Sequence, residues 1–250
     1  MTVKSNGHFD KQASLWERKF EPNGSMSQRP AAFVKQLRRN LGNSGSVLDF
    51  GCGSADITIA CQACGFQMCG IDCSEGMIER ARRRPYACGI AFTLLDSTVP
   101  LELPYPAAQF DAIIASSVFE YLCDPLDYFR EFARISVPGG FLILTVPNLL
   151  HPYRWLESVL RPFLSPAHFK NGGRLQLYAE YLSFSKIRFR LKDWICLLKE
   201  AGWELESVNA KHASLLMLVA KKICLSPRPG ANTKRDSNVT GRILIASNAG

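Results

Sequence analysis

Short apolar runs alternate with amphipathic stretches along most of this chain. Five runs have the length and content of buried strands, and they cover residues 47–50, 66–72, 90–95, 110–116 and 141–146. Between them, the stretch after Ser54, the stretch from Ser74 to Arg84 and the stretch from Pro125 to Ile135 have helical spacing. Strands that alternate with helices predict βαβ units and a parallel sheet.

The last part of the chain departs from this alternation of strands and helices. Lys192 to Ala201 is amphipathic and predicts a helix, while Trp203–Val208 and Ser214–Ala220 predict two strands joined by a short polar turn. The predicted fold is therefore α/β: a Rossmann-like, seven-stranded, mostly parallel sheet with helices on both faces and a C-terminal antiparallel hairpin.

The same pattern divides the chain into five parts. Residues 1–44 predict an N-terminal helical cap, with Phe9, Ala13, Trp16 and Phe20 on one helix and a second helix over Pro30–Asn40. Residues 45–148 form the α/β core, and residues 187–223 complete it. Residues 149–186, rich in aromatic side chains, are interpreted as an insertion that makes a lid or acceptor site, helical at its start. Residues 224–250 are dominated by Pro, Gly, Asn and Ser, which predicts a disordered tail.

Polar residues stand where four of the predicted strands end. They are Asp49 with Gly51, Asp72, Asp96 and Ser116. Ligands of open parallel sheets bind at the carboxyl ends of the strands. We therefore expect a small-molecule site at this edge, built around the tight turn Gly51-Cys52-Gly53, where glycine permits close backbone approach.

Three classes of ligand use a glycine turn after a first strand. The phosphate-binding loop needs a Gly-Lys-Ser/Thr ending, which is absent here. A dinucleotide site needs glycine at the sixth position of G-x-G-x-x-G, where this chain has Asp56, and an acid there would repel a pyrophosphate. S-adenosylmethionine carries no phosphate, so acids beside the turn are compatible with it.

The motifs resemble those of class I S-adenosylmethionine-dependent methyltransferases. VLDFGCGSADITIA is similar to the first motif of that family, CGIDCSEGMIERAR to the second, and residues 94–148 to the stretch between the third and fifth strands, including a Pro-Gly-Gly turn. The segment FSKIRFRLKDWICLLKEAGWELESV also resembles small-molecule enzymes of the ubiquinone-biosynthesis O-methyltransferase group.

The resemblance implies S-adenosylmethionine as cofactor and assigns roles to ten residues. Asp49, Gly51 and Gly53 would cradle the methionine portion, with Cys52 contributing backbone. Asp72 would accept hydrogen bonds from the ribose hydroxyls. Cys73 and Met77 would pack on the adenine, Asp96 would accept from its amine and Ser97 would donate a backbone N–H. Ser116 would line the floor near the sulfonium.

The acceptor side has a weaker signature because methyl transfer needs a base only if the nucleophile carries a proton. His151, directly after the fifth strand, is the first candidate base. Many relatives have a histidine after the glutamate that follows the fourth strand, whereas this chain has Glu120-Tyr121. Tyr121 is therefore a second candidate, although an ordinary tyrosine pKa near 10 makes it a poorer base.

Composition and charge limit the partners, the compartment and the metal sites that we expect for this chain. The net charge is +8, of which three net positives come from the tail beyond Leu225, so a nucleic-acid partner is not demanded. Nine cysteines and a polar N-terminus suggest reduced thiols in a cytoplasmic protein. The group Cys61, Cys64, Cys69 and Cys73 falls on a predicted helix and strand rather than on loops, so no metal site is expected. No uncharged apolar run is long enough to span a membrane.

The predicted function is transfer of a methyl group from S-adenosylmethionine to a small-molecule acceptor, with a hydroxyl oxygen as the first choice of atom. Two alternatives stay open: an RNA methyltransferase, and a non-catalytic S-adenosylmethionine-binding partner subunit. The sequence does not indicate the acceptor's identity or the oligomeric state.

Overall fold

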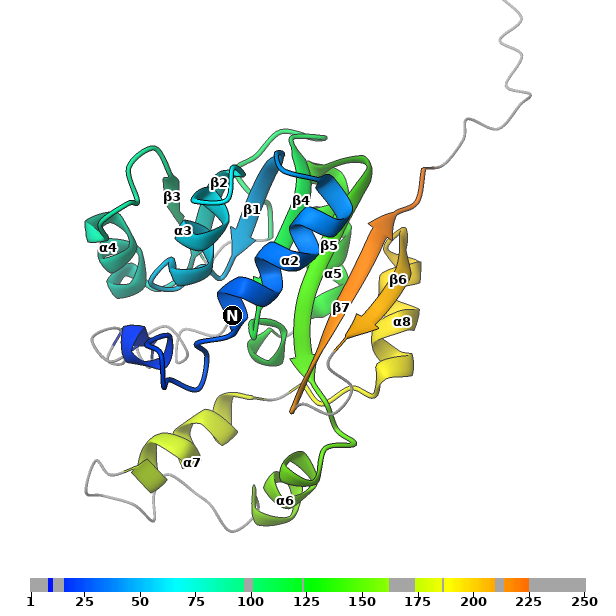
Figure 1. Cartoon of the computed structure of the whole chain (residues 1–250). Helices are drawn as coiled ribbons and strands as arrows, with labels where there is room; N and C mark the ends of the chain where they lie inside the picture. The colour runs from blue at the N-terminus through cyan, green and yellow to red at the C-terminus, as the bar shows by residue number, and fades with distance from the viewer. Residues whose placement is uncertain are drawn as a thin grey trace, which may run out of the picture.

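A computed structural model describes residues 9–10, 16–96, 101–122, 124–161, 174–185, 187–209 and 214–224. Its centre is one sheet with strand order β3-β2-β1-β4-β5-β7-β6 (Figure 1). The strands are β1 (Ser46–Phe50), β2 (Gln67–Asp72), β3 (Ala91–Leu94), β4 (Phe110–Ser116), β5 (Ser136–Pro147), β6 (Trp203–Asn209) and β7 (Leu215–Lys222).

Strands β1 to β5 pair in parallel, and β7 runs antiparallel to both β5 and β6. The chain therefore builds the sheet outward from β1 through β2 to β3, then returns to the other side of β1 to place β4. This reversal leaves a topological switch point between β1 and β4. The predicted mostly parallel sheet with its closing antiparallel hairpin is confirmed.

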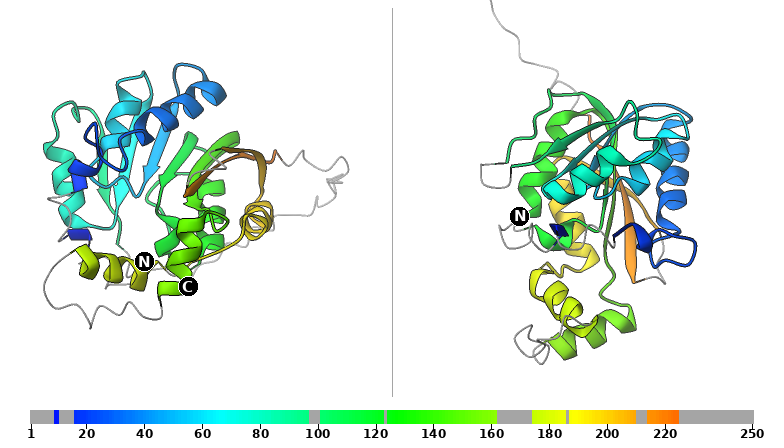
Figure 2. Two further views of the ribbon diagram at one scale, coloured as in Figure 1. Left: turned by 60° about the horizontal axis from the view of Figure 1, so that its bottom comes forward. Right: turned by 90° about the vertical axis from the view of Figure 1, so that its left-hand side faces the viewer.

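Helices cover both faces of the sheet (Figures 1 and 2). The helices of the core are α2 (Arg29–Leu41), α3 (Asp56–Gln62), α4 (Glu75–Arg83), α5 (Pro125–Ile135) and α8 (Leu191–Glu200). Alternation along β1 explains the two layers, because successive side chains of a strand point to opposite faces. Val47 packs in one cluster with Phe33 of α2, while Leu48 packs in another with Phe129 of α5 and Trp194 of α8.

One local prediction is wrong in detail. The Pro-Gly-Gly stretch does not precede β5 but lies inside it, because β4 pairs first with Ser136 and then with Phe141, so the intervening residues form a bulge. Residues 187–190 form no strand; Ile187 is buried and its N–H donates to the Glu120 carbonyl at 3.4 Å. The predicted helix with Phe9, Ala13, Trp16 and Phe20 lies partly outside the described residues; Phe9, Asp10 and Trp16 are helical, and a short 3₁₀ turn, η1 (Glu17–Lys19), follows.

The insertion lies beyond the carboxyl ends of the strands (Figure 1). It contains α6 (Pro152–Leu160), which agrees with the predicted helical start, and α7 (Arg174–Phe184), which the pattern did not indicate. No helix in the described ranges is both long and apolar enough to cross a bilayer. The predicted disordered tail, apart from Cys224, falls outside the described residues.

Candidate active site

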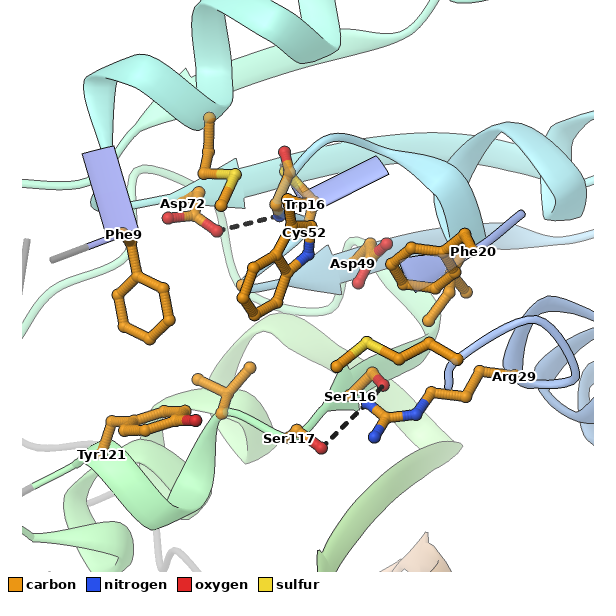
Figure 3. Close-up of a pocket in the computed structure, with 16 residues that line it drawn as sticks. Phe9, Trp16, Phe20, Arg29, Asp49, Cys52, Asp72, Ser116, Ser117 and Tyr121 are labelled. Atoms are coloured by element: carbon orange, nitrogen blue, oxygen red, sulfur yellow. Dashed lines mark hydrogen bonds between the residues drawn. The ribbon is translucent and has the colours of Figure 1, made fainter. Parts of the chain in front are cut away.

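A pocket opens at the switch point between β1 and β4 (Figure 3). It encloses about 620 Å³ of space, which includes open solvent at its mouth. Its lining comes from the ends of three strands and from the N-terminal segment: Phe9, Trp16, Phe20, Met26, Arg29, Asp49, Gly51, Cys52, Gly53, Ile57, Asp72, Met77, Ser116, Ser117, Val118 and Tyr121.

The glycine turn forms one wall of this pocket. Gly51 has φ +74°, and a Cβ at that position would lie 2.3 Å from Val118 Cγ2. Gly53 has φ +52°, and a Cβ there would lie 3.3 Å from the indole nitrogen of Trp16. Both the left-handed backbone and the close approach therefore require glycine. The turn presents bare backbone to whatever occupies the pocket.

Asp72 ties this turn to the end of β2. One carboxylate oxygen accepts the Gly53 N–H and the other accepts the Ser74 N–H, both at 2.9 Å. A carboxylate has about four acceptor positions, so lone pairs remain for a ligand. Burial raises the pKa of Asp72, and its backbone hydrogen bonds oppose that rise.

Asp49 lies beneath the turn and is almost fully buried. Its carboxylate accepts the Thr58 hydroxyl at 2.6 Å. Burial raises the pKa of Asp49 to about 7, with the Thr58 hydrogen bond opposing the shift and the charge of Asp72 adding to it. A positively charged ligand group nearby would favour the ionised form of this carboxylate.

Arg29, at the start of α2, is a site residue that the sequence did not reveal. Its guanidinium donates to Ser116 Oγ at 3.2 Å and to Ser117 Oγ at 3.0 Å (Figure 3). The described residues include no carboxylate in ion-pair distance of it. Ser117 itself has φ +55°, and its N–H donates to Thr145 Oγ1 at 2.8 Å. A half-buried cation with no carboxylate of the described residues in ion-pair distance suits a ligand carboxylate.

The N-terminal segment closes the other side of the pocket. Asp10 accepts hydrogen bonds from the Ser74 hydroxyl at 2.5 Å and from the Gly76 N–H at 3.1 Å. The Phe9 ring meets Trp16 and Tyr121 edge to face, with centroids 5.8 and 5.1 Å apart. The aromatic spacing of Phe9 and Trp16 was the signal for this contact in the sequence.

Glu120 and Tyr121, neighbours in a 3₁₀ turn called η2 (Phe119–Tyr121), have separate surroundings. Tyr121 lines the pocket. Glu120 is buried and accepts the Tyr181 hydroxyl at 2.7 Å and the Ser185 hydroxyl at 3.2 Å. Burial and the neighbouring Glu120 carboxylate raise the pKa of Tyr121 well above its usual range. This shift favours the protonated phenol, which can donate a hydrogen bond and is a poor base.

The structure brings most of the expected site residues together and leaves others aside. Those that line the pocket are Asp49, Gly51, Cys52, Gly53, Asp72, Met77, Ser116 and Tyr121. Cys73 and Asp96 are not in its lining, and Ser97 lies outside the described residues. His151 is not in the lining either: it caps α6, with its ring Nδ1 accepting the Tyr153 N–H at 3.3 Å.

The thiols at the site are buried. Burial raises the pKa of Cys52 well above its usual range, with the Asp72 charge adding to it, and burial raises the pKa of Cys73 to about 12. Both shifts disfavour the thiolate, which is the reactive form of a cysteine. Among the described residues, no group of His, Cys, Asp and Glu has the arrangement of a metal site.

Comparisons with known proteins agree with this geometry. A family model described as "Methyltransferase domain" matches residues 23–208, which is more than half of the chain. The chain therefore belongs to the methyltransferase-domain family. This confirms the expected class I S-adenosylmethionine-dependent methyltransferase, and with it S-adenosylmethionine as the cofactor.

Individual relatives are more distant. The chain is similar to the ubiquinone biosynthesis O-methyltransferase of Vibrio cholerae, with 26% identity over 56% of this chain and 58% of the relative. It is also similar to the 27-O-demethylrifamycin SV methyltransferase of Amycolatopsis mediterranei, with 35% identity over 39% of this chain and 37% of the relative. The match therefore spans less than two thirds of either relative.

Among solved structures, the fold is similar to magnesium protoporphyrin IX methyltransferase from Synechocystis PCC 6803 with bound SAH. The TM-score is 0.65 at 16% sequence identity, over 88% of this chain and 99% of that one. At this identity the likeness concerns the fold alone.

Proposed function

We propose that this chain transfers a methyl group from S-adenosylmethionine to a hydroxyl oxygen of a small-molecule acceptor. The observation that carries the proposal is the pocket itself. It combines a bare glycine turn, a carboxylate with free lone pairs and a half-buried arginine at the switch point of the sheet. The two O-methyltransferases to which the chain is similar support oxygen as the acceptor atom.

The residues present fit the cofactor's chemistry group by group. Asp72 has lone pairs left for the two ribose hydroxyls after its bonds to Gly53 and Ser74. Arg29 offers positive charge to the methionine carboxylate, and Asp49 offers negative charge to the ammonium. Gly51 and Gly53 leave the space that a side chain would fill. When bound, the cofactor supplies a methyl carbon on a sulfonium, which is already a good leaving group.

The chain's own task is then to position the acceptor and exclude water. Alignment of the reacting atoms accounts for roughly 7–11 kcal/mol in well-oriented reactions. Phe9, Trp16 and Tyr121 form an aromatic wall beside the glycine turn. Such a wall suits an apolar or aromatic acceptor. The protonated Tyr121 hydroxyl would donate a hydrogen bond to the acceptor oxygen. His151 stays a prediction as a base.

Two measurements test this function. Saturable binding of S-adenosylmethionine is measured by calorimetry, and transfer of a labelled methyl group is measured with a panel of phenolic and aliphatic alcohols. We expect binding, transfer to at least one hydroxyl acceptor, and a reduced kcat with unchanged cofactor affinity in Tyr121→Phe. Absence of cofactor binding refutes the proposal. Binding without transfer to any acceptor class would favour a non-catalytic partner subunit, and transfer confined to RNA would favour an RNA methyltransferase.

A further inference from the structure

Buried polar side chains connect the insertion to the pocket. Helix α6 turns Arg154 and Glu157 inward, with 7% and 1% of their surface exposed. Arg154 Nη1 donates to Glu157 Oε2 at 2.8 Å and to the Tyr181 hydroxyl at 2.7 Å. The Tyr178 hydroxyl donates to Glu157 Oε1 at 2.9 Å. Tyr178 and Tyr181 both belong to α7, so a buried ion pair holds the two helices together. Loss of one partner of such a pair leaves an uncompensated charge, which strongly constrains the arrangement of α6 and α7.

The Tyr181 hydroxyl is held by two hydrogen bonds. It accepts the bond from Arg154 and donates its own proton to Glu120 Oε2 at 2.7 Å. Glu120 is also fixed: its carboxylate accepts the Ser185 hydroxyl at 3.2 Å, and its backbone carbonyl accepts the Ile187 N–H at 3.4 Å. Because the single proton of the phenol and one of its lone pairs are both engaged, this network holds the Tyr181 ring in one orientation.

The Tyr181 ring contacts Tyr121, which lines the pocket. The two rings meet edge to face, with centroids 6.3 Å apart and planes at 77°, an arrangement that aromatic pairs favour. The Phe9 ring makes a second such contact with Tyr121, at 5.1 Å and 80° (Figure 3). Within the described part of the chain, no residue forms a hydrogen bond with the Tyr121 hydroxyl. The direction of this hydroxyl therefore depends on the rings that pack against Tyr121.

We propose that Tyr181 is a positioning residue for methyl transfer. Its hydroxyl, held between Arg154 and Glu120, fixes its ring against Tyr121, and the Tyr121 hydroxyl is thereby directed at the acceptor oxygen. The proposal rests on the proposed function, in which Tyr121 donates a hydrogen bond to that oxygen. A displacement of about 1 Å can lower a rate by about a hundredfold. The insertion thus contributes to the reaction by alignment, without contact between Tyr181 and the acceptor.

Fluorine NMR tests the positioning step and needs no acceptor. The full chain is labelled with 3-fluorotyrosine, and among its seven tyrosines Tyr121 is assigned as the resonance that Tyr121→Phe removes. Tyr181→Phe keeps the ring but loses both hydroxyl hydrogen bonds, so we expect the Tyr121 resonance to shift or broaden. Tyr178→Phe is the matched control, because it removes a hydroxyl of the same helix that bonds to Glu157 instead of Glu120. It should leave the Tyr121 resonance unchanged.

Methyl-transfer kinetics test the consequence for the reaction, with the phenol or alcohol of the panel that accepts the methyl group most rapidly. Tyr181→Phe should lower kcat at least about tenfold and leave the affinity for S-adenosylhomocysteine unchanged. In the Tyr121→Phe background the same substitution should have no further effect on kcat, because the residue through which Tyr181 acts is already altered. Glu120→Gln keeps an acceptor oxygen for the Tyr181 hydroxyl and should retain most of kcat, whereas Glu120→Met should behave like Tyr181→Phe.

Melting temperature and affinity for S-adenosylhomocysteine show whether each variant is folded. If Tyr181→Phe does not fold, the comparison of Glu120→Gln with Glu120→Met decides in its place. The proposal is overturned by a Tyr121 resonance that is unchanged in folded Tyr181→Phe. It is also overturned by losses of kcat that add fully in the double variant, since these indicate a purely structural role. If no phenol or alcohol accepts a methyl group, the proposed function fails, while the Tyr121 resonance still decides whether Tyr181 fixes Tyr121.

Discussion

Asp72→Ala separates the two tasks of this carboxylate, which braces the glycine turn and is proposed to accept the ribose hydroxyls. The substitution removes both 2.9 Å hydrogen bonds from the Gly53 and Ser74 N–H groups. A hydrogen bond to a charged group contributes about 1.5–3 kcal/mol, and a buried donor left unpaired costs about 1–3 kcal/mol. Loss of even one ribose contact therefore weakens binding at least about tenfold.

The assay has two readouts, calorimetric affinity for S-adenosylhomocysteine and thermal unfolding. For a chain of this size each kcal/mol corresponds to about 2–4 °C in Tm, so Asp72→Ala should melt several degrees lower while remaining folded. Asp124→Ala is the matched control: its exposed carboxylate caps α5 by accepting the Leu126 N–H at 3.1 Å. It should lower Tm with no change in affinity. An Asp72→Ala protein that is folded and binds as tightly as the unaltered chain would refute the ribose assignment.

Three further predictions follow from the same pocket. Arg29→Gln should weaken affinity for S-adenosylhomocysteine about tenfold but leave 5′-methylthioadenosine, which lacks the amino-acid carboxylate, unaffected; equal losses in calorimetry would contradict the carboxylate role. Folding raises the pKa of Asp49 to about 7, so between about pH 4 and 7 the folded chain keeps a proton that the unfolded chain releases, and stability falls as the pH rises through this range. Asp49→Asn should flatten this part of the pH dependence of the urea midpoint of unfolding. An unchanged slope would refute the assignment of this pH dependence to Asp49. Gly51→Ala, with φ +74° and the close approach to Val118, should be clearly less stable than Gly89→Ala, which has φ +82° but open space around it; equal melting temperatures would show that Val118 moves aside freely.

The sheet could be predicted because each strand can be recognised from the pattern of side chains within a single segment of the sequence. β4 has the same bounds in the sequence pattern and in the structure, because its central residues 112–115 form an apolar run that is buried on both faces. The helix α5 was equally clear, with Asp124 as N-cap and Pro125 in its first turn. The bulge inside β5 could not be predicted, because it depends on which residues of β5 pair with β4. Pairing is a property of two strands and is not visible in the sequence of one.

The candidate-site residues that stand at the ends of strands could be predicted from the sequence, and the other site residues could not. Asp49 and Asp72 stand at fixed positions after short apolar runs. Arg29 comes from a helix packed on the sheet, and nothing in its local sequence distinguishes it from Arg38 or Arg39. The polarity of α6 is hidden for a related reason: Arg154 and Glu157 are buried only because their partners Tyr178 and Tyr181 lie on another helix.

The turn η2 connects the pocket with the insertion. Tyr121 lies with the cofactor half of the chain, while the side chain of Glu120 is bonded to Tyr181 and Ser185 of the insertion. Replacing the insertion with that of a relative, in order to alter acceptor choice, would leave the buried Glu120 carboxylate without the hydroxyl donors of Tyr181 and Ser185. A chimera should therefore carry the relative's own residue at position 120 along with the new helices.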